Sequence, residues 1–344
     1  MAVEEQLSEP PAPRANPDLT GHDEAERALL AAWSSGRMPH AWLISGPRGI
    51  GKATLAYRLV RFVMAGGETG GLFGAPSSLA IPATDPVFRR VAAGGHADVL
   101  TLEPGMVHPE TGKVTQEIVV GHVRRAIEFL LKTSAESGWR AVIVDEAEAM
   151  NRNAANALLK LLEEPPARCV IVLVSHSPGR LLPTIRSRCR SLVLRALTDG
   201  QVGTLLARYR PALDESERAI LIGLAKGSIG RAIDLADRGG AELYRELTGL
   251  LDAMPALDIP AAHALADRFS RAGDDAASGF RTVMELAADW IARRLMAEPG
   301  EAWTEAWERV SRLSAATEGL NLDRKQSLLA MLFAAQRAAR GDGK

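Results

Sequence analysis

The sequence has little cysteine and no excess of charge of either sign. Two of its 344 residues are cysteines, Cys169 and Cys189, which excludes a framework of several disulfides and a zinc site of four thiolates. Lone cysteines are usually buried as small apolar side chains, and we interpret both in this way. Lys and Arg number 41 against 42 Asp and Glu, so the chain lacks the overall positive field of an autonomous DNA-binding protein. Any contact with nucleic acid must be local or shared with other chains.

Long hydrophobic runs and recognisable metal spacings are also absent. Runs such as 169–174 fall far short of the roughly 20 residues that span a bilayer. Glu4 and Glu5 stand where a signal peptide would carry basic residues, and we expect a cytoplasmic protein. None of the seven histidines has the spacing of a metal ligand set, so no metal residue is predicted.

The order of apolar runs predicts an α/β domain followed by helices. Four prolines among small and acidic residues predict a flexible arm over residues 1–20. Residues 21–197 alternate short apolar runs with helical segments, which predicts a five-stranded parallel sheet. The expected strands are 41–45, 98–102, 141–145, 169–175 and 191–195.

Two further stretches set the expected domain boundaries. The Gly- and Pro-rich stretch 66–95 reads as a surface excursion and not as a continuous helix. Beyond residue 197 the pattern is entirely helical, and two prolines in 254–260 predict a break. We therefore expect a small helical domain over 198–254 and a larger one over 255–344.

A glycine-rich turn points to phosphate binding. Gly46, Gly49, Gly51 and Lys52 follow the expected strand 41–45 and open an expected helix. Backbone N–H groups of such a turn can surround phosphates, and the lysine adds a point charge. A ligand-free strand-to-helix turn is the alternative interpretation.

The position after this lysine departs from the motif. Ala53 stands where a Ser or Thr hydroxyl ordinarily binds Mg²⁺. Thr54 comes next, but one helical residue turns a side chain by about 100°, so it is no simple substitute. We predict that ATP is a candidate ligand, that the Mg²⁺ site is impaired, and that hydrolysis by this chain is weak or absent.

Two acids follow a later strand. Asp145 can hold Mg²⁺ through water and Glu146 can activate an attacking water, although a solvated acidic turn over 145–148 is the alternative. The polar run 175–177 ends the next strand and either senses a γ-phosphate or caps a turn. Arg186, Arg188 and Arg190 form either a surface cluster or a donor to a phosphate in a neighbouring subunit.

Four segments, 46–52, 145–151, 156–166 and 185–189, resemble in order the motifs of the bacterial clamp-loader group of AAA+ proteins. The resemblance covers about 24–236. It implies an AAA+ nucleotide-binding fold, a small helical lid and a helical collar that joins a five-subunit ring. Within the group the chain is most similar to the delta-prime family, because Ala53 replaces the hydroxyl residue of the gamma/tau motor subunits and 181–186 reads like delta-prime. Many relatives carry a four-cysteine zinc module, but 66–95 has no cysteine, so no zinc is expected.

The resemblance also implies roles and partners. Arg188 matches an arginine that acts in trans on ATP held by an adjacent motor subunit, and Arg231 matches a lid arginine that senses nucleotide, with an exposed lid arginine as the alternative. The implied partners are the gamma/tau and delta subunits of a hetero-pentamer within DNA polymerase III, the sliding clamp and primed DNA. No polymerase chemistry is expected of the chain itself. Trp303 and Trp307 in the helical tail belong either to a core or to a collar interface.

Two other functions remain open at this point. One is a self-sufficient AAA+ ATPase like gamma/tau, with Lys52, Asp145 and Glu146 as a working site. The other is a nucleotide-binding regulator outside replication.

Overall fold

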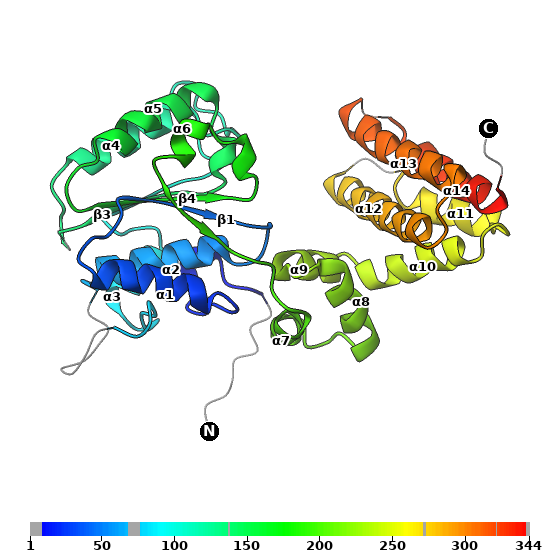
Figure 1. Ribbon diagram of the computed structural model, residues 1–344, viewed down its shortest axis with the longest axis horizontal. Coiled ribbons are helices and arrows are strands. Elements are labelled where there is room, and N and C mark those ends of the chain that lie inside the picture. The colour runs from blue at the N-terminus through cyan, green and yellow to red at the C-terminus, as the bar shows by residue number, and fades with distance from the viewer. Residues whose placement is uncertain (1–8, 68–75, 137, 271–272, 321, 342–344) are drawn as a thin grey trace. The chain divides into compact units, whose positions relative to one another are not determined.

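The computed structural model describes residues 9–67, 76–136, 138–270, 273–320 and 322–341 (Figure 1). Contacts group the chain into two compact units. The first comprises Met1–Pro211 and Ala225–Arg231, and the second comprises Ala212–Leu224 and Ala232–Lys344. The further division of the helical part into a lid and a collar stays a prediction.

The first unit is built on a five-stranded sheet in the order β2-β3-β4-β1-β5, with every neighbouring pair parallel. This confirms the predicted parallel sheet. The strands are β1 (Ala41–Ser45), β2 (Val99–Leu102), β3 (Arg140–Val144), β4 (Cys169–Ser175) and β5 (Arg190–Val193). Every residue of the adjacent strands β1, β3 and β4 is buried, as expected for a parallel sheet covered on both faces.

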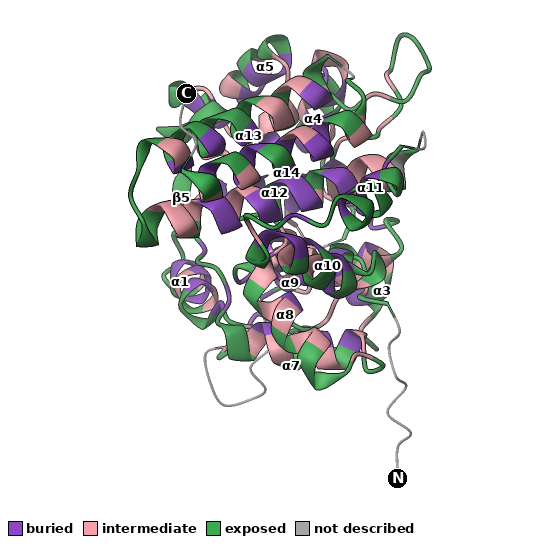
Figure 2. Ribbon diagram, turned by 90° about the vertical axis from the view of Figure 1, so that its right-hand side faces the viewer, coloured by how far each residue is buried: buried purple, intermediate pink, exposed green. Residues whose placement is uncertain are grey.

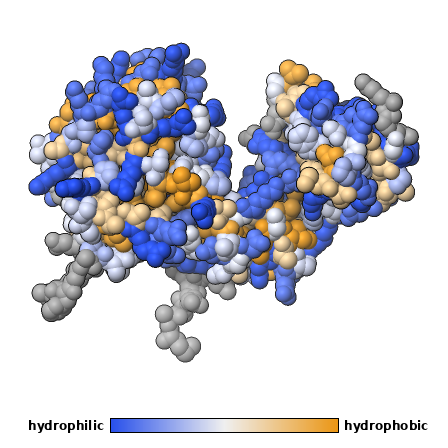
Figure 3. Space-filling view, viewed as in Figure 1, coloured by the Kyte–Doolittle hydropathy of each residue, from blue (hydrophilic) through white to orange (hydrophobic). Residues whose placement is uncertain are grey.

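Successive strand residues point to opposite faces of the sheet, and each face has its own core. Ile143 and Val172 belong to the core with α1, α2 and α3, whereas Val142 and Leu173 belong to the core with α4, α5 and α6. Figure 1 shows these two groups of helices on opposite sides of the sheet. The helices of this unit are α1 (Asp23–Ser34), α2 (Lys52–Met64), α3 (Pro86–Ala92), α4 (Val120–Leu131), α5 (Arg152–Glu163), α6 (Pro183–Arg186) and α7 (Asp199–Tyr209). On the face seen in Figure 3, hydrophilic residues dominate the surface over α4 and α5, with hydrophobic ones scattered among them.

The structure adds detail to one expectation for this unit and corrects another. The excursion 66–95 contains α3, which begins at Pro86 after Asp85, whose side chain accepts a hydrogen bond from Val87 N. A proline in the first turn after an Asp cap favours helix initiation, so this proline starts a helix instead of interrupting one. Residues 68–75 of the excursion lie outside the described residues.

The described part of the expected flexible arm, residues 9–20, is fixed by hydrogen bonds and an ion pair. Residues 13–15 form a short 3-10 helix, and Arg61 donates to the carbonyls of Arg14 and Asn16 at 3.0 and 2.7 Å. Arg208 pairs with Asp18 at 2.7 Å. Composition indicated too little apolar surface for order, but the segment is fixed through its backbone carbonyls and one carboxylate, which composition does not reveal. Residues 1–8 lie outside the described residues.

The second unit is helical. Its elements are α8 (Glu215–Ala225), α9 (Ile229–Asp237), α10 (Gly240–Asp252), α11 (Ile259–Asp267), α12 (Asp274–Ala297), α13 (Glu301–Gly319) and α14 (Arg324–Arg340), of which α8 and α9 each have residues in both units. The chain leaves the helical conformation between α10 and α11, and Asp258 caps α11 by accepting from Ala261 N. Buried and exposed positions alternate along α12, α13 and α14 (Figure 2), as in amphipathic helices. Trp303 lies in the core at 8% exposure, whereas Trp307 is 43% exposed. No described helix is both long and apolar enough to cross a bilayer.

Candidate functional site

Three loops meet at the carboxyl edge of the sheet. The predicted phosphate loop follows β1, the acids at 145–148 follow β3, and the polar turn 175–177 includes the end of β4 and continues beyond it. Because β4 lies between β3 and β1, these three loops are neighbours at one edge. Ligands of open α/β sheets bind at this edge.

The phosphate loop has the backbone that anion binding requires. Gly46, Gly49 and Gly51 have φ values of 149°, 73° and 102°, which side chains other than glycine rarely adopt. Helix α2 begins directly after Gly51, and no side chain caps its first turn. The N–H groups of that turn are therefore the donors that a phosphate would meet at the positive end of the helix.

Lys52 lies within this loop at 7% exposure. Its Nζ donates to the carbonyl of Pro47 at 2.6 Å, so the ammonium group closes the loop. Burial lowers the pKa of Lys52 below its usual value, and the carboxylates of Glu148 and Asp145 oppose that shift. Lys52 is thus a buried positive group beside the carboxylates of this edge.

The two predicted acids lie differently at this edge. Burial raises the pKa of Asp145 above its usual value, although the carboxylate accepts from Glu146 N at 2.9 Å. Glu146 adopts a left-handed φ of 50°, an uncommon conformation for a residue other than glycine. Its carboxylate pairs with Arg48 of the phosphate loop at 2.6 Å, so one acid is buried and the other is tied to the loop.

The residues present fit a phosphate chain. Glycine backbone, helix terminus and Lys52 supply donors for phosphate, whereas Ala53 supplies no oxygen. The hydroxyl residue Thr54 is 7% exposed. Within the described ranges no cluster of three or more His, Cys, Asp or Glu side chains is placed to hold a metal ion. Bound ATP would contribute its own phosphate charge here, and Gly46, Gly49, Gly51 and Lys52 would hold it.

Glu148 is a site residue that the sequence analysis passed over as part of an acidic turn. Its Oε1 accepts from the backbone N–H groups of His176 and Ser177 at 2.9 and 3.0 Å and lies 2.7 Å from His176 Nδ1. The side chain is 3% exposed. The one available signal was its place three residues after Asp145, at the end of a strand next to β4.

The segment that carries Arg231 contacts the phosphate loop through Ser228 and Gly230, two residues to which the sequence assigned no role. Ser228 Oγ donates to the carbonyl of Arg48 at 2.8 Å, and Gly230 N donates to the carbonyl of Gly49 at 2.9 Å. A Cβ at Gly49 would lie 2.5 Å from Ser228 Oγ. Arg231 follows directly, with its N–H bonded to Ser228 Oγ at 3.1 Å, and its role as a nucleotide sensor stays a prediction.

The structure does not bring Arg188 to this site. Arg188 precedes β5, whose Arg190 pairs with Trp42 near the start of β1, so it lies at the amino edge of the sheet. Its guanidinium pairs with Glu163 of α5 at 2.7 Å, and 36% of the side chain is exposed. His40, just before β1, lies 3.1 Å from the carbonyl of Leu162, which places the end of α5 at the same edge. The phosphate loop and Arg188 therefore occupy opposite edges.

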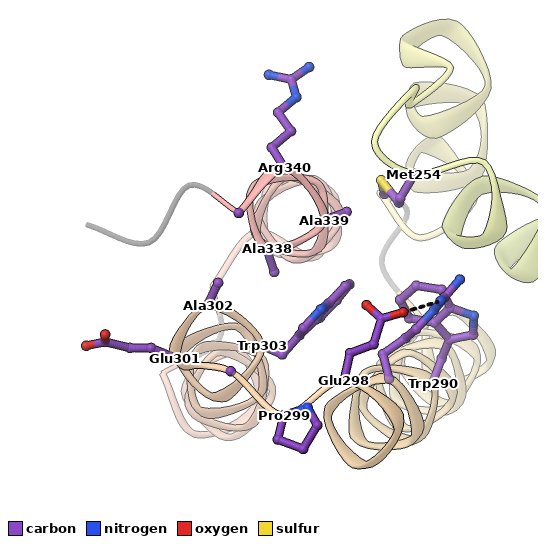
Figure 4. A pocket seen from close by; sticks show the side chains of 13 residues that line it. Met254, Trp290, Glu298, Pro299, Glu301, Ala302, Trp303, Ala338, Ala339 and Arg340 are labelled. Atoms are coloured by element: carbon purple, nitrogen blue, oxygen red, sulfur yellow. Dashed lines mark ion pairs between the residues drawn. The ribbon is translucent and has the colours of Figure 1, made fainter.

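The second unit contains a separate cavity of about 780 Å³ among α12, α13 and α14. Figure 4 shows the rings of Trp290 and Trp303 facing it, with centroids 5.8 Å apart. Arg294 and Glu298 of its wall pair at 3.7 Å. The lining of this cavity includes Gly300 and Gly341 but no lysine, so it is the weaker candidate for phosphate.

Comparison with known proteins bears on the first unit most directly. The family profile described as "DNA polymerase III, delta subunit" matches residues 21–198. The chain is 40% identical over 163 residues to DNA polymerase III subunit delta' of Pseudomonas aeruginosa, covering 46% of this chain and 45% of that protein. It is 35% identical over 209 residues to subunit delta' of Escherichia coli, covering 60% and 57%.

More distant relatives extend over more of the chain. DNA polymerase III subunit gamma/tau of Mycobacterium tuberculosis is 27% identical over 337 residues, covering 89% of this chain and 55% of that protein. The chain spans about half the length of the curated relatives it matches. A gamma subunit-related protein of Thermotoga maritima of known structure is 19% identical, covers 91% of this chain and 100% of that chain, and has a TM-score of 0.44.

Proposed function

The chain belongs to the DNA polymerase III delta subunit family, whose profile matches just over half of it, residues 21–198, and from this membership we propose that it is a delta-prime-type subunit of a clamp loader. Its partners in this proposal are gamma/tau and delta chains in a hetero-pentamer, the sliding clamp and primed DNA. The names of its relatives, which are DNA polymerase III subunits, support membership of such a complex.

The observation that carries the proposed role in trans is the position of Arg188. An arginine at the amino edge of the sheet is remote from the chain's own phosphate loop, yet 36% of its side chain is exposed and accessible to a neighbouring subunit. A planar guanidinium is suited to neutralising the charge that develops on a transferred phosphoryl group. In this role the Arg188 guanidinium leaves Glu163 and acts in trans on ATP held next door.

The chain's own nucleotide site has a minor part in this function. Gly46, Gly49, Gly51 and Lys52 hold ATP phosphates, while Ala53 leaves Mg²⁺ without its usual hydroxyl ligand. Asp145 and Glu146 stay near the phosphates, but Glu146 is paired with Arg48 at 2.6 Å. We expect weak or absent hydrolysis by this chain and a supporting role for Arg231 at most.

The test is reconstitution of the complex with Arg188→Ala and, as the matched control, Arg186→Ala two residues away. Loss of an arginine finger lowers turnover at one site by about a thousandfold or more. The Arg188 variant should therefore assemble normally and lose the share of clamp- and DNA-stimulated ATPase that comes from the adjacent motor subunit. Unchanged single-turnover hydrolysis at that site would rule out the role in trans.

A self-sufficient ATPase remains the second candidate, because Lys52, Asp145 and Glu146 share one edge of the sheet. The purified chain distinguishes the two functions. Brisk hydrolysis by the isolated chain, abolished by Lys52→Ala and indifferent to partner subunits, would favour the motor.

A further inference from the structure

The turn at the end of β4 is organised around a carboxylate of the chain itself. Oε1 of Glu148 receives two adjacent backbone N–H groups, those of His176 and Ser177. It also lies 2.7 Å from His176 Nδ1. Ser175 Oγ accepts from Ser177 N at 3.1 Å, which closes the turn on itself. Adjacent N–H groups converging on one oxygen form the arrangement with which loops bind anions.

Burial strengthens this arrangement. The Glu148 side chain is 3% exposed, and Ser175 is fully buried, so the hydrogen bonds form away from bulk water. Charge-assisted hydrogen bonds of this kind are stronger than neutral ones. Burial alone would raise the pKa of Glu148, but the surrounding hydrogen bonds and His176 hold it below its usual value. The carboxylate is therefore stabilised in its charged form.

The same carboxylate faces the nucleotide site. Burial lowers the pKa of Lys52, and the negative charge of Glu148 opposes that shift. Oε1 of Glu148 already accepts from two N–H groups at the end of β4. The donors of the turn are already engaged.

We propose that Glu148 is a positioning residue that acts as a built-in anion, fixing the turn 175–177 in one conformation whether or not a nucleotide phosphate lies beside it. The phosphate loop is supported independently from its outer side by Ser228 and Gly230. Both sides of the nucleotide site are thus held by protein contacts. The inference concerns the isolated chain and holds whether or not the chain assembles into a clamp loader.

The test is amide hydrogen exchange in the full chain, comparing wild type with Glu148→Gln, Glu148→Ala and the control Glu164→Gln, which removes an exposed carboxylate. A hydrogen bond to a charged group contributes about 1.5–3 kcal/mol. The amides of His176 and Ser177 should therefore exchange about ten to a hundred times faster in Glu148→Ala and about five times faster in Glu148→Gln, whose amide oxygen still accepts hydrogen bonds. The control should exchange at the wild-type rate.

Glu148→Gln separates charge from shape, because glutamine fills the same space without the negative charge. A purely space-filling role would leave its exchange rates as in wild type, which would overturn the proposal. The proposal also requires that ATP leave the exchange of residues 175–177 unchanged in wild type, so a tenfold slowing on addition of ATP would overturn it as well.

Discussion

Gly230→Ala gives the sharpest test of how the phosphate loop is supported. Gly230 lies in the first turn of α9, and its φ is not among the positive values, so alanine is conformationally acceptable there. The obstacle is steric. A Cβ at this position would lie 2.9 Å from Gly49 Cα, which is backbone and cannot rotate aside as a flexible side chain does.

The magnitude follows from three opposing effects. Replacing glycine by alanine within a helix ordinarily stabilises a protein by about 0.5–1 kcal/mol. Overpacking against a rigid neighbour costs about 1–3 kcal/mol. Displacing the loop also lengthens the hydrogen bond from Gly230 N to Gly49 O, now 2.9 Å, with a loss of about 1 kcal/mol. The net expectation is a destabilisation of about 1–3 kcal/mol, or roughly 2–10 °C in Tm for a unit of this size.

Calorimetry together with amide exchange of β1 would measure this in the unit that contains the sheet. Gly200→Ala is the matched control, because Gly200 lies in α7 of the same unit and a Cβ there meets no atom within 4 Å. The same substitution should therefore stabilise at Gly200 and destabilise at Gly230. Equal or greater stability of Gly230→Ala would show that the contact between the two backbones is not tight.

Two further predictions concern the metal site and acid stability. Ala53→Thr restores a hydroxyl at the start of α2, so this variant should bind ATP more tightly in Mg²⁺ than in EDTA. Wild type should show little difference between the two conditions. Equal Mg²⁺ dependence of ATP binding in the two proteins, measured by calorimetric titration, would refute the argument about position 53. The second prediction concerns Glu26, whose carboxylate accepts from Leu79 N at 2.6 Å and from Ser78 Oγ at 2.8 Å. Burial alone would raise the pKa of Glu26, but these hydrogen bonds and Arg58 hold it below its usual value of 4.5. The folded state therefore binds this proton more weakly than the unfolded state, so the stabilisation is present above pH 4.5 and is lost as pH falls through the lowered pKa. Glu26→Gln should therefore reduce the loss of unfolding free energy between pH 7 and acid pH. Urea unfolding at several pH values measures this, and the same pH dependence in wild type and variant would refute the prediction.

The sequence was informative where structure depends on local pattern. The helix expected from Lys52 onward spans Lys52–Met64, because an apolar stripe and a preceding glycine turn are encoded in consecutive residues. Strands 41–45 and 169–175 have the expected bounds because both are continuous apolar runs. The order of the N-terminal arm was not predicted, because Arg61 holds it through main-chain carbonyls. Every residue has such a carbonyl, so the sequence carries no signal of this contact.

The site was predictable only in its separate parts. Lys52, Asp145 and the turn 175–177 could each be placed at a strand end, and parallel strands bring those ends to one edge. The contact of Gly230 with Gly49 could not be predicted, because it joins residues 181 positions apart in the sequence through backbone atoms alone. The partners of Glu148 likewise depend on β3 and β4 being neighbours, and strand order is not written in any local pattern.

The burial of Arg61 has a practical consequence for work on this protein. Its guanidinium is 1% exposed, lies 4.4 Å above the ring of Phe88 and relies on carbonyls that precede the first long helix. Deleting the chain through Asn16 would leave the buried guanidinium of Arg61 without these two hydrogen-bond acceptors, which is unfavourable. Residues 14–16 are themselves not buried, but their carbonyls complete the interior of the first unit, so tags or labels should be attached without removing them.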